Sequence, residues 1–151
     1  MQEREKYRLQ QSLGYQMSIA SRQQERRLDI GLKPLGLTRI TWCVLLAVGN
    51  EALVHPSKIA EFVGIDRTAT SRALRQMEAD GMIARTTGSD DKRMTAVRLT
   101  LKGESLLEKG TPLAKSNNAI LDQRLDANER LELRRLLKKV QQGEDVALSR
   151  L

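Results

Sequence analysis

The stretch from residue 56 to residue 103 constrains the fold of this 151-residue chain more than any other part of it. Residues 56–63 begin with proline, which suits the first turn of a helix, and carry apolar side chains at helical spacing. Gly64 can take the left-handed conformation that ends a helix, and Asp66 can cap a following one. The sequence therefore predicts a short helix, a tight turn and a second helix over about 67–80.

The second predicted helix has two chemically different faces. The positions that repeat at i, i+3, i+4 and i+7 form its buried side, and they are Thr70, Ala73, Leu74 and Met77. The opposite side is polar and rich in arginine, and it carries Arg67, Thr68, Ala69, Ser71, Arg72 and Arg75. A helix fits the major groove of DNA, where Arg, Ser and Thr bond to bases or phosphates and an Ala methyl can touch thymine. Solvated basic helix faces are also common, so the helix alone leaves both interpretations open.

A predicted β-hairpin follows the second helix and favours DNA binding. Residues 82–84 open a short strand, and residues 86–91 have the composition of a turn. Residues 95–99 alternate between apolar and other side chains, which predicts a return strand. Two helices followed by such a hairpin form the pattern of a winged helix-turn-helix.

The tip of the hairpin is charged. Lys92 and Arg93 lie there, and an arginine on a protruding arm suits the negative potential of a minor groove. Free carboxylates beside it would repel phosphate. We therefore expect Asp91 to pair with Arg85 or Arg93 and to fix the shape of the hairpin.

These motifs resemble the MarR family of bacterial transcription regulators over about residues 37–107. The segments that carry the resemblance are Leu37-Thr38, Ile59-Ala60, Ser71-Arg72-Ala73-Leu74, the run from Glu78 to Arg85, Asp91-Lys92-Arg93, Leu99-Thr100 and Gly103. Two residues depart mildly from the family pattern. Thr70 stands where the family usually has a β-branched aliphatic residue, and Met77 replaces the usual leucine.

The resemblance implies a mainly α fold with a small β-hairpin wing, flanked by N- and C-terminal dimerisation helices. It implies a sequence-specific regulator that binds a pseudo-palindromic operator in double-stranded DNA as a homodimer. It further implies repression that is relieved by a small-molecule effector bound between the DNA-binding part and the dimer helices. Residues 37–100 would then form the DNA-binding domain, between dimerisation helices in 1–36 and 101–151.

The expected site residues follow from the helix face, the wing and the resemblance. The side chains expected to contact DNA are Ser57, Arg67, Thr68, Ala69, Ser71, Arg72, Arg75, Lys92 and Arg93. Arg85 and Asp91 are expected to stabilise the wing.

The flanks have helical patterns of their own. Helices are predicted over residues 3–30, 38–48, 101–125 and 127–142, with caps at Thr38, Thr100 and Asp126. The terminal helices carry apolar stripes that one chain of this size cannot easily cover. The sequence thus favours a homodimer, which would present two recognition helices about 34 Å apart. Packing within a single chain is the alternative.

Composition agrees with a nucleic-acid partner. The net charge is +7 and the pI is about 9.9, which favours a polyanionic partner. Aromatic side chains make up only 3% of the residues, which disfavours single-strand binding by base stacking. The chain lacks an apolar run of membrane-spanning length, begins with polar residues and has one cysteine, so we expect a cytoplasmic protein.

Three residues invite a chemical role, and the sequence favours a structural one for each. Cys43 lies in an apolar run, which predicts packing rather than redox sensing. Trp42 is expected in the core, bordering a pocket where the DNA-binding part meets the dimer helices. His55 is the single histidine and lies at a helix entry, so a typical zinc site is not expected.

The sequence holds no recognisable arrangement for catalysis, so we expect neither an enzyme nor a cofactor or metal. Two other functions remain as alternatives to an effector-controlled regulator. One is an architectural DNA-binding protein without a ligand. The other is a helical protein-interaction module whose basic charge is incidental.

Overall fold

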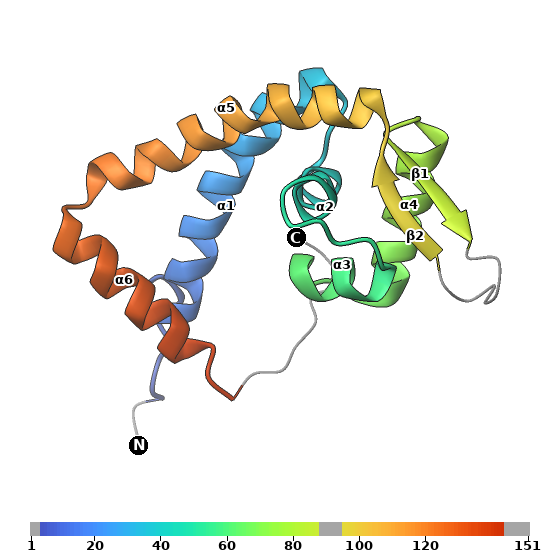
Figure 1. The fold of residues 1–151 in the computed structure, drawn as a ribbon. Helices are drawn as coiled ribbons and strands as arrows, with labels where there is room; N and C mark the ends of the chain where they lie inside the picture. Colours follow the sequence, from blue (N-terminus) through green and yellow to red (C-terminus); the bar gives the residue numbers. More distant parts are fainter. Residues whose placement is uncertain (1–3, 88–94, 144–151) are drawn as a thin grey trace.

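The computed structural model describes residues 4–87 and 95–143 of the chain. The elements, in chain order, are η1 (Leu9–Gln11), α1 (Leu13–Leu32), η2 (Lys33–Leu35), α2 (Arg39–Gly49), α3 (Pro56–Val63), α4 (Arg67–Ala79), β1 (Ile83–Thr87), β2 (Thr95–Leu99), α5 (Leu101–Arg124) and α6 (Ala127–Val140). Helices α2, α3 and α4 and the hairpin form a lobe, which we call the central lobe, residues 39–99 (Figure 1). Helices α1, α5 and α6 extend to one side of it, and we call them the helical arm (Figure 1).

The side-chain caps predicted from the sequence set the helix boundaries. Thr38, Thr100 and Asp126 each accept a hydrogen bond from the backbone N–H three residues later. Asp66 does the same for α4, with 2.7 Å between its carboxylate and the nitrogen of Ala69. These bonds satisfy N–H groups that have no partner inside the helix. The predictions for α2 to α6 are confirmed to within about two residues.

Two local predictions were wrong. The N-terminal helix begins at Leu13 and not near residue 3, because the Ser12 hydroxyl caps it and the preceding turn is the short η1. Strand β1 also extends through Thr87, although the sequence predicts a turn over residues 86–91. Threonine is β-branched and favours strands, and Thr87 pairs with Thr95 across the antiparallel hairpin.

The hydrophobic core lies inside the central lobe and is closed by the arm. Side chains with almost no exposure come from α1, α2, α3, α4 and both strands, and they include Leu32, Val44, Leu45, Ile59, Leu74, Met77, Ile83 and Val97. Helix α2 is buried on most sides, as its apolar sequence predicted. Trp42 is a core residue, and it packs against α5 at Gly110, where a Cβ would come within 2.4 Å of the indole ring.

The start of α5 is joined to the end of α4 through backbone carbonyls. The Thr100 hydroxyl donates to the carbonyl of Gly81, and the Thr100 N–H donates to that of Met82 at 3.1 Å. The Lys102 ammonium donates to the carbonyl of Asp80 at 2.7 Å. A Cβ at Gly103 would collide with the Met82 carbonyl, so the two segments approach each other as closely as glycine allows.

The arm leaves an apolar surface uncovered in the single chain. Helix α6 has no buried residue, and its stripe of Leu133, Leu136, Leu137 and Val140 is exposed. The side chains of Leu9, Leu13 and Met17 near the N-terminus are exposed as well. No single helix within residues 4–87 and 95–143 is long and apolar enough to cross a membrane.

Candidate nucleic-acid interface

Helix α4 presents its basic face to solvent because its apolar face is part of the core. Thr70, Leu74 and Met77 are buried, as predicted, and the Thr70 hydroxyl donates to the carbonyl of Asp66 at 2.9 Å. The opposite face is therefore directed outward. The residues exposed on it are Arg67, Thr68, Ser71, Arg72 and Arg75, and Ala69 beside them is half-buried.

A groove of about 540 Å³ lies where α3, α4 and β2 meet. Its lining consists of His55, Pro56, Ser57, Lys58, Arg67, Thr70, Ser71 and Thr95. Three predicted site residues, Ser57, Arg67 and Ser71, are thus brought together from two helices. The groove is bounded by the N-terminal turn of α3, where the helix dipole adds partial positive charge.

Sequence reasoning missed three residues of this groove. His55 precedes α3, and Lys58 lies in its first turn. Their position at the start of the helix before α4 is the sequence signal that could have identified them. Thr95 begins β2, and nothing in its local sequence placed it beside α3 and α4. Lys58 also contacts Glu61 at 3.1 Å, but both side chains are largely exposed.

The hairpin is tied to α4 by Arg85. Its guanidinium donates to one carboxylate oxygen of Glu78, at 2.9 Å from Nε and 2.6 Å from the second terminal nitrogen. The sequence predicts that Asp91 pairs with Arg85 or Arg93, and the contact of Arg85 with Glu78, at the end of α4, does not test that pairing. Asp91, Lys92 and Arg93 lie outside the described residues.

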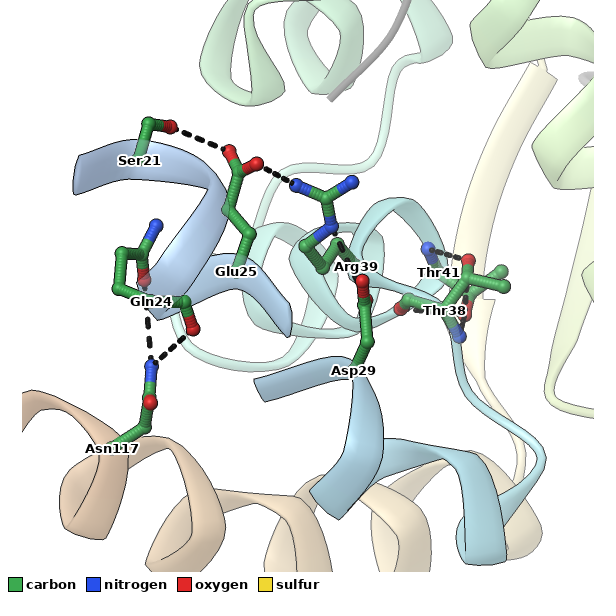
Figure 2. Close-up of polar contacts among 8 residues, drawn as sticks. All are labelled: Ser21, Gln24, Glu25, Asp29, Thr38, Arg39, Thr41 and Asn117. Carbon is green, nitrogen blue, oxygen red and sulfur yellow. Dashed lines mark hydrogen bonds and ion pairs between the residues drawn. The ribbon is translucent and has the colours of Figure 1, made fainter. Parts of the chain in front are cut away.

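Polar contacts also join the arm to the central lobe (Figure 2). Arg39, in the first turn of α2, contacts Glu25 at 2.6 Å and Asp29 at 3.2 Å, both on α1. On the other side of α1, the side-chain amide of Asn117 on α5 donates to the backbone carbonyl of Gln24 at 3.2 Å. Helix α1 is therefore held by charged and polar groups from two neighbouring helices.

A second cavity, of about 460 Å³, lies between α2 and α5. Trp42 lines it, as expected, together with Leu46, Asn50, Thr111, Ala114, Lys115, Asn118 and Asp122. Cys43 is half-buried nearby on α2, and burial raises the pKa of its thiol while the charge of Arg39 lowers it to a smaller extent. A raised pKa agrees with the packing role that the sequence predicted.

In the described part of the chain, no group of three or more His, Cys, Asp or Glu side chains is placed to hold a metal ion. The chemistry available at the groove is instead that of exposed arginine, lysine, serine and threonine beside a helix start. Such groups bind phosphates and base edges.

Comparisons with known proteins agree with this geometry. Residues 35–94 match the model of the MarR family. The multiple antibiotic resistance protein MarR of Escherichia coli strain K12 is 29% identical over 129 residues, which are 85% of this chain and 90% of that protein.

Solved structures with the same fold include DNA complexes. A cysteine-to-serine variant of E. coli MarR complexed with operator DNA has a TM-score of 0.77 and 29% identity, covering 85% of this chain and 92% of that one. The regulator MOSR of M. tuberculosis, in complex with DNA, has a TM-score of 0.73 and 28% identity, covering 87% and 95%. BpsR of Bordetella bronchiseptica shares the fold, with a TM-score of 0.82 at 20% identity and coverage of 93% and 100%. The helix-turn-helix, the hairpin and these matches together show that the chain is similar to the MarR family of winged helix-turn-helix transcription regulators.

Proposed function

We propose that this regulator binds a two-fold symmetric operator in double-stranded DNA as a homodimer and represses transcription there. The observation that carries the proposal is the exposed basic face of α4, which continues into the groove beside α3. Helix α4 would enter the major groove, with Thr68, Ser71 and Arg72 facing base edges. Arg67, Ser57 and Arg75 would hold phosphates, and the half-buried Ala69 would contact a thymine methyl.

The wing supplies the second part of the proposed interface. Strands β1 and β2 extend from the lobe beside α4, and Arg85 fixes β1 to Glu78 at the end of that helix. We expect Lys92 and Arg93, beyond the described end of β1, to lie along the adjacent minor groove. The negative potential of a narrow minor groove favours arginine at such a position.

The proposed dimer uses the helical arm. Residues 1–36 and 101–151 would supply its interface, and residues 37–100 would bind DNA. The stripe on α6 and the apolar residues near the N-terminus are uncovered in one chain, and a second copy would cover them. Proteins of the MarR family function as dimers, which supports this arrangement.

We place the effector site in the cavity between α2 and α5. Trp42, Leu46 and Ala114 offer apolar surface there, while Lys115 and Asn118 offer polar groups. Asp122 also lines the cavity and accepts from the Asn118 amide at 2.9 Å, so a ligand that fits would have an apolar body and one polar group. The DNA binding of BpsR is regulated by 6-hydroxynicotinic acid, which is a small molecule of this general kind.

Selection of bound sequences from random duplex DNA tests the proposal. The full-length chain should enrich a motif with two related half-sites about one helical turn apart. Binding without sequence enrichment would instead indicate an architectural protein, whose ratio of specific to non-specific affinity is small. Absence of duplex binding even at low salt would favour a protein-interaction module.

Salt dependence measures the phosphate contacts. A dimer that engages about 6–10 phosphates should have a log–log slope of affinity against salt of roughly −5 to −9. A slope near −2 would mean that most basic residues face away from DNA and would contradict the proposed interface.

A further inference from the structure

His55 lines the groove beside α3 and α4 together with two cations, Lys58 and Arg67. It precedes Pro56 as the N-cap of α3, but its side chain makes no capping hydrogen bond there. The imidazole therefore has no part in capping α3. The hydroxyl residues of the same groove are Ser57, Thr70, Ser71 and Thr95.

The electrostatics of the groove suit an anion. Of the described residues that line it, Lys58 and Arg67 carry charge and none is acidic. Two carboxylates of the neighbouring helices already have partners, since Glu61 contacts Lys58 at 3.1 Å and Asp66 caps α4 by accepting from the N–H of Ala69. The start of α3 adds partial positive charge at the same end.

We propose that His55 binds a backbone phosphate of DNA in this groove and that duplex binding by this protein is therefore coupled to proton uptake. The inference rests on the proposed function and assigns a residue to it that sequence reasoning left out. A protonated imidazole has two N–H donors and a positive charge, whereas a neutral one has a single donor and no charge. His55 is the single histidine of the chain, so one substitution per subunit removes every imidazole from the protein.

The first test compares the wild-type chain with His55→Gln on a random-sequence 30-base-pair duplex, in buffers free of phosphate. As the pH falls from 8 to 5.5, the wild-type affinity should rise by about threefold to fivefold per subunit more than that of the variant. The log–log salt slope should also become steeper by about 0.9 for each His55 that binds a phosphate, in the wild type alone. At pH 8 the two proteins should bind almost equally.

Two further variants separate a phosphate contact from a structural role. His55→Arg keeps a positive charge at all these pH values, so its affinity should be high and nearly independent of pH. Lys58→Gln should weaken binding at every pH while the pH dependence remains. Circular dichroism at each pH verifies that all four proteins are folded.

The results distinguish this inference from the proposed function. If the wild type and His55→Gln have the same pH dependence and the same salt slopes, His55 does not bind phosphate and the inference is wrong, although DNA binding stands. If the folded wild type does not bind duplex at any pH, the proposed function itself fails.

Discussion

The guanidinium of Arg39 lies 2.6 Å from a carboxylate oxygen of Glu25, and this ion pair joins the first turn of α2 to the middle of α1. A second contact, of 3.2 Å, joins Arg39 to Asp29 one turn further along. The side chains of Arg39 and Glu25 are only 22% and 26% exposed, so water and salt screen the pair less than an ion pair at the open surface. The helical arm is thus fixed to the central lobe by charge as well as by packing.

Replacement of this arginine should loosen that joint. Arg39→Met should lower the free energy of unfolding in urea by about 1–2 kcal/mol, because the contacts of the guanidinium with Glu25 and Asp29 are lost. Glu61→Gln is a matched control, since it removes an ion pair whose side chains are 63% and 72% exposed. That change should cost less than about 0.5 kcal/mol, and an equal loss in both variants would contradict the special role of Arg39.

The close contact between Gly110 on α5 and Trp42 on α2 predicts that a methyl group added at residue 110 destabilises the fold. In Gly110→Ala the new Cβ would lie 2.4 Å from the ring of Trp42, so the indole must move and the core must repack. We expect a loss of about 1–3 kcal/mol in urea unfolding and an altered fluorescence spectrum from the single tryptophan. Gly14→Ala is the control, because its Cβ meets nothing within 4 Å, and it should stabilise α1 slightly. Unchanged fluorescence in Gly110→Ala would mean that the helices are further apart.

Arg72 should determine base preference at one operator position. Arg72→Ala should cost about 1–3 kcal/mol on the best selected duplex and relax the preference at that base pair. Arg26→Ala removes an exposed arginine on α1 and should leave the preference unchanged. Equal weakening on all duplexes would identify Arg72 as a phosphate contact. An unchanged affinity would mean that α4 does not enter the major groove of DNA.

Burial of Cys43 predicts a specific pH effect on stability. The pKa of its thiol is raised above the ordinary 9.0 in the folded chain, so the unfolded chain releases this proton at lower pH. The contribution to stability is therefore fully present below about pH 9 and is lost as the pH rises through the folded pKa. Cys43→Ala should show a shallower decline of urea midpoint between pH 8.5 and pH 10.5 than the wild type. A decline of the same steepness in both would mean that the thiol is exposed.

The apolar stripe of α6 should be required for the dimer. Leu136 and Leu137 are 43% and 41% exposed in the single chain, and changing both to Glu places two charges where a partner would pack. Sedimentation should then show a monomer of about 17.0 kDa with greatly reduced operator binding. Phe62→Glu is the control, because Phe62 is 49% exposed on α3, outside the segments proposed for the interface, and should leave the dimer intact. A doubly substituted chain that still binds the full operator tightly would contradict the two-half-site mechanism.

Local chemistry explains which parts of the fold could be predicted. Each cap at Thr38, Asp66, Thr100 and Asp126 involves a bond between residues only three apart, so the sequence contains the whole interaction. The start of α1 was missed because the polar run before Ser12 is equally compatible with helix and with irregular backbone. The first residue of α1 is set by the Ser12 cap, and the spacing of apolar residues does not reveal it.

The site was predicted where one element supplies it and missed where several elements meet. The exposed face of α4 followed from helical periodicity alone. The pairing of Arg85 with Glu78 depends on how the hairpin leaves the helix, and the joining of His55 with Thr95 depends on how β2 passes α3. Such contacts arise from tertiary packing, which no local pattern encodes.

The hydrogen bonds from Thr100 and Lys102 to the carbonyls that follow α4 fix the start of α5 beside that helix. A rotation of the arm about this point would therefore displace its far end most. Helix α5 has 24 residues and is therefore about 36 Å long, so a rotation of about 5° at the joint moves its far end by about 3 Å. The first turn of α5 cannot slide independently, because Thr100 and Lys102 bind the last carbonyls around Gly81. In the proposed dimer the angle between the arm and the central lobe would set the distance between the two α4 helices, so a molecule that changed this angle would change the operator spacing that the dimer can bind.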